Sequence, residues 1–185
     1  MQNDKPSSDI HSMGDPLSEM PWSADFVMQA LEVLQVFMRD GRLSSMRPGH
    51  ADSFVVGWPA GKKPEEVAEG AMTLRGMDPL VLHSTSWRHA DKEVVLTYIA
   101  AVPPNSDPPP TWQVVEVGHA ELARGDATAP PTSIDIMQVQ EHALRHLAWL
   151  LQDDPVIADI LADWSDALSD YIPEPFRALG GPAGM

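Results

Sequence analysis

The stretch LVLHSTSWRHADKEVVLTYIAAV, residues 80–102, decides the fold that the sequence predicts. Two runs rich in β-branched and aromatic residues, 80–87 and 93–102, flank a polar segment, which is the pattern of a β-hairpin. The second run is apolar on both faces, so we expect it in the centre of a sheet that helices cover. The hairpin therefore anchors the predicted sheet.

Two more strands are predicted outside this hairpin. SFVVGW, residues 53–58, precedes it, and residues 112–122 follow it after a proline-rich loop at 103–110 that cannot pair in a sheet. Between the first strand and the hairpin, residues 64–75 are expected to form a short helix, because Pro64 suits a first helical position. The predicted sheet thus has about four strands.

Helices are predicted at both ends of this sheet. Residues 23–40 have apolar side chains at helical spacing, so that they fall on one face of a predicted helix, and so do residues 134–150 and 155–170. The stripe of the first helix is Val27, Ala30, Leu31, Leu34, Phe37 and Met38. The stripe of the last helix is Ile157, Ile160, Leu161, Trp164 and Leu168. The expected fold is α+β, with a mostly antiparallel sheet packed by N-terminal and C-terminal helices.

The chain length favours one domain with tails. At 185 residues it suffices for one well-buried core. Residues 1–21 are polar, contain prolines and lack apolar periodicity, so they are expected to be a disordered leader. We therefore expect a single domain over 22–176 and a flexible tail over 177–185.

Composition excludes several classes of protein. The formal net charge is −15, and such a surface repels phosphate backbones, so we expect no binding to nucleic acid. No window approaches 18 consecutive apolar residues, so we expect no membrane span. Cysteine is absent, which rules out disulfides and thiolate metal sites and fits a cytoplasmic protein.

One polar and aromatic stripe runs along the helix predicted at 134–150. Gln138, His142, His146 and Trp149 follow one another at steps of four, four and three, beside the apolar stripe of the same helix. Such a stripe can line a ligand pocket, or its histidines can simply pack at the edge of the core. We expect it to bind a small molecule or a protein partner.

His142 and His146 are also the candidate metal ligands, because histidines four apart on one helical face can reach the same ion. The sequence His-Ala-Leu-Arg-His lacks the glutamate that zinc proteases place after the first histidine, so that class is excluded. A third ligand would have to come from His83, His119 or a carboxylate. No cofactor is indicated.

The first strand of the hairpin carries three further candidates for ligand binding, His83, Ser84 and Trp87. Regular alternation predicts His83 and Trp87 on one face and Ser84 on the other. No Gly-x-Ser-x-Gly motif surrounds Ser84, and adjacent residues of a strand point to opposite faces, so His83 is not expected to activate it. This argues against a serine hydrolase.

The last predicted helix carries an acidic ridge opposite its apolar stripe, spaced four, three and four residues. The ridge comprises Asp159, Asp163, Asp166 and Asp170. A solvated face is one interpretation, and a docking surface for a basic protein partner is the other.

Residues 55–176 resemble a family of uncharacterised bacterial proteins. The resemblance rests on VLHSTSWR (81–88), VVLTYIAAVP (94–103), QVQEHALRHLAWLLQDDP (138–155) and YIPEPF (171–176). It implies no activity and no residue roles.

The layout of a strand to residue 58, a helix at 64–75 and the hairpin is also similar to that of Nudix hydrolases. The Nudix box, however, requires a glutamate six positions after its glycine and an Arg-Glu pair before Glu-Glu for magnesium. Counting from Gly61 places Val67 at the glutamate position, and Arg75 is followed by Gly76. A Nudix-like fold here would therefore lack pyrophosphatase chemistry.

Three functions remain open from the sequence. The first is a domain that binds a small ligand or a protein partner through the stripe of helix 134–150. The second is a metal-dependent or hydrolase-type enzyme using His142 and His146, although no catalytic signature is recognisable. The third is an interaction protein that uses the acidic ridge.

Overall fold

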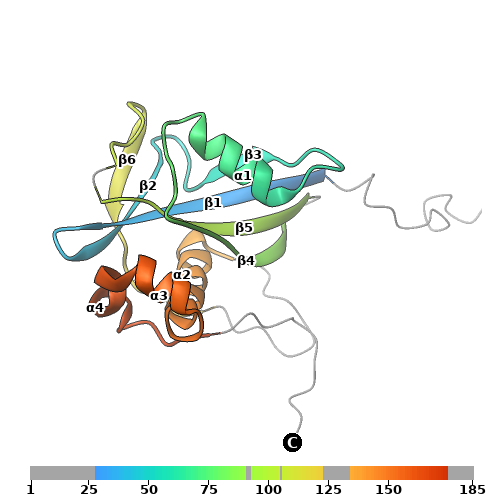
Figure 1. The fold of residues 1–185 in the computed structure, drawn as a ribbon. Helices are drawn as coiled ribbons and strands as arrows, with labels where there is room; N and C mark the ends of the chain where they lie inside the picture. Colours follow the sequence, from blue (N-terminus) through green and yellow to red (C-terminus); the bar gives the residue numbers. More distant parts are fainter. Residues whose placement is uncertain (1–27, 91–92, 105, 123–133, 175–185) are drawn as a thin grey trace, which may run out of the picture.

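The computed structural model of the protein describes residues 28–90, 93–104, 106–122 and 134–174 (Figure 1). Its elements are β1 (Met28–Arg39), β2 (Arg42–Pro48), β3 (Phe54–Gly57), α1 (Pro64–Thr73), β4 (Val81–Ala90), β5 (Glu93–Ala101), β6 (Trp112–Glu116), α2 (Ile136–Asp153), α3 (Pro155–Ile160), the 3-10 turn η2 (Ala162–Trp164) and α4 (Ser165–Leu168). The leader and the tail predicted at 1–21 and 177–185 lie outside the described residues.

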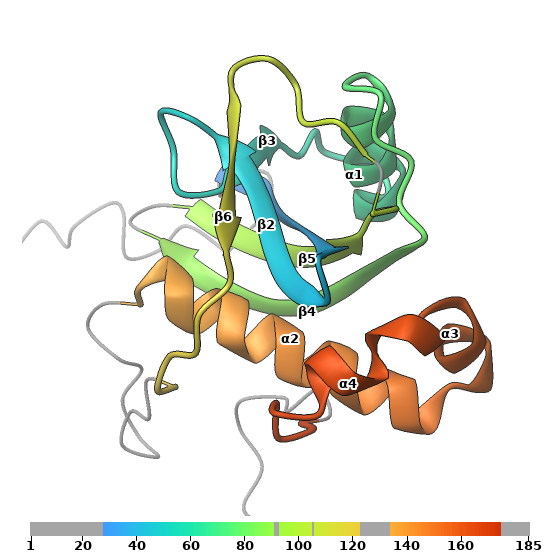
Figure 2. The same cartoon turned by 90° about the vertical axis from the view of Figure 1, so that its left-hand side faces the viewer.

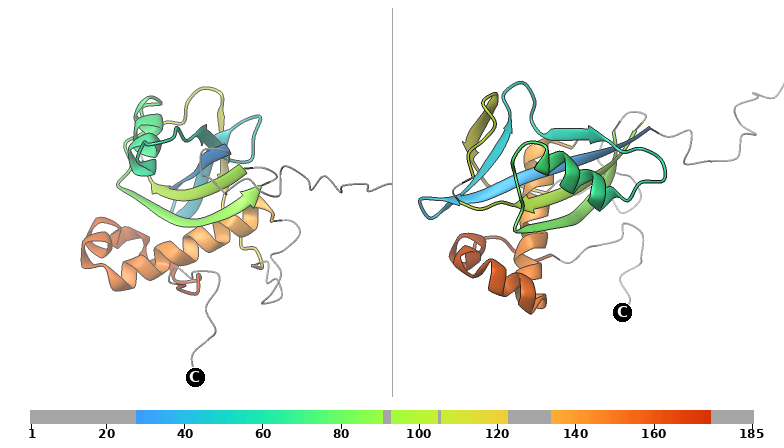
Figure 3. Two further views of the ribbon diagram at one scale, coloured as in Figure 1. Left: turned by 90° about the vertical axis from the view of Figure 1, so that its right-hand side faces the viewer. Right: turned by 45° about the horizontal axis from the view of Figure 1, so that its top comes forward.

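A mixed six-stranded sheet forms the middle layer, with the strand order β4-β5-β1-β2-β6 and β3 beside β1. The β1–β5 pairing is parallel, and the other pairings are antiparallel. Helix α1 covers one face, and α2 crosses the other face with α3 and α4 beyond it (Figures 2 and 3). The α+β class and the hairpin of β4 and β5 are confirmed, and the expected number of strands was too low.

Each face of the sheet has its own hydrophobic core. On the α1 side, Met72 and Met77 pack against Leu31 and Tyr98. The core on the α2 side is larger, and it joins the sheet to α2 and to the C-terminal elements. Its fully buried members include Val36, Ile99, Ala101, Ala143, Leu144, Leu147 and Leu161.

The helix predicted over residues 23–40 is wrong, because residues 28–39 form the central strand β1. A strand that is buried on both faces has no polar face, so its sequence shows no period-two alternation. Glu32 and Gln35, which fitted the solvent side of a helix, are both buried. Tertiary pairing on both sides therefore overrides the helical periodicity of this segment.

Strand β2 is missing from the sequence-based prediction, although the Asp40-Gly41 dipeptide before it is a typical signal of a hairpin turn. Asp40 and Gly41 both have positive φ, of 51° and 75°, and Arg39 pairs with Arg42 across them. Asp-Gly at a two-residue turn with positive φ is the usual connection of a β-hairpin. Asp40 and Gly41 therefore form the turn of the β1–β2 hairpin.

A buried ion pair ties β1 to the hairpin. Glu32 on β1 is 1% exposed and binds the guanidinium of Arg88 on β4 through both oxygens, with nitrogen–oxygen distances of 2.6 and 2.9 Å. Thr97 on β5 and Ser53 before β3 donate further hydrogen bonds to the same carboxylate. These charge-assisted hydrogen bonds join β1, β4 and β5 and fix their relative positions.

The helix predicted over residues 155–170 is broken into α3, η2 and α4. The backbone leaves helical geometry at Leu161, which has φ −108° and ψ 29°. The break turns Leu161, Trp164 and Leu168 into the core on the α2 side, whereas Ile160 stays 45% exposed. The apolar stripe predicted for one continuous helix is therefore wrong at Ile160.

None of the described helices is long and apolar enough to cross a lipid bilayer.

Candidate functional site

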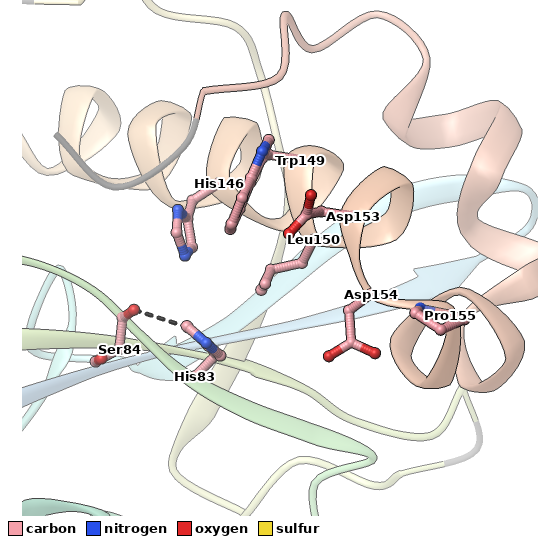
Figure 4. Close-up of a pocket in the computed structure, with 8 residues that line it drawn as sticks. All are labelled: His83, Ser84, His146, Trp149, Leu150, Asp153, Asp154 and Pro155. Atoms are coloured by element: carbon pink, nitrogen blue, oxygen red, sulfur yellow. Dashed lines mark hydrogen bonds between the residues drawn. The ribbon is translucent and has the colours of Figure 1, made fainter.

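An open cleft of about 710 Å³ lies between the edge strand β4 and the C-terminal half of α2 (Figure 4). It is lined by His83, Ser84, His146, Trp149, Leu150, Asp153, Asp154 and Pro155. Strand β4 provides one wall, α2 provides the second, and the start of α3 contributes Asp154 and Pro155. This volume falls in the range of ligand pockets.

His146 is the most unusual residue of the cleft. Its side chain is 1% exposed, yet neither ring nitrogen forms a hydrogen bond with any described residue. Burial lowers its pKa to about 4, and the neighbouring His83 and His142 add to this effect by charge repulsion. The backbone of Glu174 raises the pKa of His146 by a smaller amount, although it does not meet the geometry of a hydrogen bond to either ring nitrogen. His146 is therefore neutral at physiological pH, and its one donor and one acceptor nitrogen both lack a hydrogen-bond partner among the described residues.

Aromatic rings surround His146 on two sides. The ring of His83 is centred 5.2 Å from it, and the indole of Trp149 is centred 5.4 Å from it. Figure 4 shows the His146 ring on α2 pointing toward the segment of β4 that carries His83 and Ser84. The inner part of the cleft is thus a cluster of flat rings whose hydrogen-bonding atoms are the nitrogens at the ring edges.

The tautomer of His83 follows from its backbone contact. Its Nδ1 lies 2.8 Å from the carbonyl oxygen of Ser84. Because a carbonyl can only accept, Nδ1 carries the proton and donates. In the neutral ring the other nitrogen, Nε2, is then an acceptor. The cleft therefore contains an acceptor nitrogen on His83 beside the neutral ring of His146.

A β-bulge in β4 determines which side chains reach the cleft. His83 lies opposite Ile99, but the register shifts between Ser84 and Ser86, so Trp87 lies opposite Leu96. Directly opposed residues share a face, and the bulge reverses the alternation after it. Trp87 is therefore on the α1 face, and the prediction that it shares a face with His83 is wrong.

The stripe predicted along α2 divides into two parts. His146 and Trp149 line the cleft, whereas Gln138 and His142 do not. Gln138 completes the capping box at the start of α2, where its Oε1 accepts from the backbone of Asp135. His142 is half-buried, and its Nε2 lies 3.4 Å from the carbonyl of Thr85, within the bulge.

The structure gives no support to a metal site at His142 and His146. Within the described ranges, no group of three or more His, Asp or Glu side chains is arranged to hold a metal ion. A hydrolase arrangement is also missing there. Nδ1 of His83 is bound to a backbone carbonyl rather than to a carboxylate, so no acid orients this ring as catalytic triads require.

A second polar cluster holds the outer side of α2. Glu141 is buried and accepts hydrogen bonds from Arg145 at 2.7 Å and from the Ala120 backbone and His119 at 3.3 Å. This pair of residues four apart on α2 lies at an interface with the segment after β6, where His119 and Ala120 contact Glu141. The Glu174 backbone donates to the Arg145 carbonyl and so lies close to His146.

Tyr171 packs against the ring of His119 in the same cluster. Burial raises its pKa to about 12, with further contributions from Glu141 and Asp170. Its hydroxyl therefore stays protonated at physiological pH. This cluster fixes the C-terminal segment to α2, and none of its side chains is among the residues that line the cleft.

Sequence reasoning missed four residues of the cleft, namely Leu150, Asp153, Asp154 and Pro155. One signal was available, because Asp154-Pro155 predicted that a helix begins directly after the helix carrying His146. The structure confirms that start, with Asp154 accepting from the backbone of Val156 and Ile157. A sharp turn at this place brings the start of α3 beside the last turn of α2.

The acidic ridge predicted from a continuous helix is interrupted. Asp159, Asp163, Asp166 and Asp170 are all exposed, but they lie on or after three separate short elements. Their regular spacing therefore does not place them along one helical face. A docking role for them stays a prediction.

Comparison with protein-family models gave no match for this chain, and comparison with curated proteins gave none either.

Proposed function

We propose that the protein binds a small organic molecule in the cleft between β4 and α2, and that it does so without catalysing its conversion. The observation that carries this proposal is the state of His146. A buried polar group without a partner costs about 1–3 kcal/mol, and His146 bears two such atoms at the wall of a cleft. A ligand that donates to one nitrogen or accepts from the other offsets this cost.

The surroundings of His146 support binding rather than catalysis. The neighbouring rings of His83 and Trp149 offer flat contact surfaces to a planar molecule. Residues that would act as an activated nucleophile, an oriented base or a metal set are not assembled in the described part of the cleft. The polar and aromatic groups therefore favour recognition.

The similarity to the layout of Nudix hydrolases enters this proposal in a limited form. We infer a Nudix-like arrangement from the order of β3, α1, β4 and β5, without the acidic motif that binds magnesium in that family. Helix α1, at the place of the Nudix helix, packs on the sheet face opposite α2. The cleft proposed here shares only β4 with this layout, because its other wall is α2.

The proposal is tested by titrating the 15N-labelled protein with benzimidazole, a planar molecule with one N–H donor and one acceptor. We expect a dissociation constant on the order of 1 mM, as is usual for a fragment of this size. The expected shifts are at the backbone of β4 and the C-terminal half of α2 and at the Trp149 indole. The chain has six tryptophans, so resolved indole signals are preferable to total fluorescence.

The variant His146→Phe keeps a ring of similar size and removes both nitrogens, and we expect it to weaken binding at least fivefold. His50→Phe, at an exposed position outside the cleft, is the matched control and should leave binding unchanged. Shifts confined to other surfaces, or equal affinity of His146→Phe and the wild-type protein, would contradict the proposal.

A further inference from the structure

The charges around the cleft indicate which kind of molecule it takes. Among its lining residues none is lysine or arginine, whereas two, Asp153 and Asp154, are acidic. His146 adds no positive charge, because it is neutral at physiological pH. We infer that the ligand is an organic cation, a protonated amine attached to a planar ring; this inference rests on the function proposed above.

The carboxylates of Asp153 and Asp154 differ in whether the protein already provides hydrogen-bond partners for them. Asp154 caps α3, and its Oδ1 accepts from the backbone N–H groups of Val156 and Ile157. Asp153 is exposed, and no hydrogen bond or ion pair engages its carboxylate among the described residues. A negative charge free to meet a ligand is therefore supplied by Asp153.

The position of Asp153 is unfavourable for the isolated helix. It lies in the last turn of α2, where unpaired carbonyl groups give the helix end a partial negative charge. No basic residue occupies that turn. An acid there repels the helix end, and a cation bound beside it would relieve both the carboxylate and the carbonyls.

The aromatic part of the ligand has a matching surface. Trp149 and Asp153 are four residues apart on α2, so their side chains are neighbours on one face of the helix. An indole attracts a cation over its ring and stacks with a planar group. The stripe of His146, Trp149 and Asp153 thus presents a neutral hydrogen-bonding ring, an aromatic face and a carboxylate in succession.

An organic cation fits these observations better than a metal ion does. Asp153 and the histidines of the cleft are not arranged as a metal-binding group in the described chain. The lining also includes Leu150, Pro155 and the Trp149 ring, which are contacts for carbon atoms rather than for an ion. The buried ring of His146 lines the same cleft and points toward β4, and neither of its nitrogens has a hydrogen-bond partner among the described residues, which is an independent sign of a ligand with its own polar group.

Three probes of nearly equal size separate the charge of the ligand from its ring: phenethylamine (cation), 2-phenylethanol (neutral) and 3-phenylpropionate (anion). Each is titrated into the full chain at pH 7.5 and followed by NMR shifts at the cleft, with EDTA present to remove metal ions. We expect phenethylamine to bind at least tenfold more tightly than 2-phenylethanol, and 3-phenylpropionate to bind more weakly than either.

Asp153→Asn should weaken phenethylamine binding at least threefold and change 2-phenylethanol binding less than twofold. Asp159→Asn removes an equal charge from an exposed site outside the cleft and serves as the matched control, with no effect on either probe. Asp153→Asn is not expected to lower the melting temperature, since it removes repulsion at the helix end. An equal loss of both probes would overturn the role assigned to Asp153.

The possible failures are distinguishable. If none of the three probes nor benzimidazole binds at the cleft, the proposed function itself fails. If 2-phenylethanol or 3-phenylpropionate binds as tightly as phenethylamine, the cleft binds ligands but the cation inference is overturned. Displacement of phenethylamine by zinc or magnesium chloride in the absence of EDTA would overturn it in favour of a metal site.

Discussion

Replacing His146 with glutamine is expected to make the protein less sensitive to acid. The pKa of His146 is about 4 in the folded chain and 6.5 in the unfolded chain. Between these values the unfolded state binds more protons than the folded state does, so stability rises with pH. The wild-type protein therefore loses stability as the pH falls from 6.5 to 4, and the glutamine variant lacks this contribution.

The size of the effect follows from the two pKa values. The difference between 6.5 and about 4, at about 1.36 kcal/mol per pKa unit, corresponds to roughly 3 kcal/mol. Carboxylates that titrate in the same range act equally in both proteins, so the comparison isolates His146. For a chain of this length, roughly 3 kcal/mol corresponds to a melting temperature change of about 6–12 °C.

Urea unfolding followed by circular dichroism, at pH values from 7.5 to 4, measures this difference. His50→Gln is the matched control, because it replaces an exposed histidine and should keep the wild-type dependence on pH. The quantity compared is the slope of the free energy of unfolding against pH, and not the absolute stability of His146→Gln. Equal slopes for the wild-type protein and His146→Gln, or an NMR titration that places the pKa of His146 near 6.5, would refute the reasoning.

Two further predictions concern the scaffold. Arg88→Met leaves the buried carboxylate of Glu32 without its cation and should lower the free energy of unfolding by about 3–5 kcal/mol, measured by urea unfolding. The double variant with Glu32→Met should recover most of this loss, and a double variant as unstable as the single one would contradict the prediction. Asp135→Ala removes the N-cap of α2 and should lower the free energy of unfolding by about 1 kcal/mol, measured by thermal unfolding. Asp135→Ser should stay near the wild-type stability, and equal losses of stability in both variants would show that capping is not the cause.

The elements that local signals define could be predicted from the sequence. The hairpin of β4 and β5, the start of α1 at Pro64 and the start of α3 after Asp154 all follow from residues within a few positions of each element. Strand β1 could not be found this way. Glu32 and Gln35 are buried there only because distant residues, Arg88 and Met72, provide hydrogen-bond partners.

The cleft shows the same limit. His146 and Trp149 were found from their spacing on one helix, which needs no tertiary information. Their pairing with His83 depends on how α2 crosses the sheet, and the exclusion of Trp87 depends on a bulge that shifts the register of one strand. The capping motif of Asp135 and Gln138 was readable in the sequence, and it would have removed Gln138 from the predicted pocket.

The parallel pairing of β1 with β5 determines when the sheet can be completed during synthesis. Leu31 pairs with Leu96, 65 positions later, so one side of the central strand stays open until β5 has left the ribosome. The neighbouring β1–β2 hairpin has only short-range pairings and can form earlier. Since residues 28–39 also have helical periodicity, their local preference competes with the strand throughout this interval. Refolding of the full chain should therefore be slow and sensitive to protein concentration, because one edge of the apolar strand β1 stays exposed until β5 pairs with it.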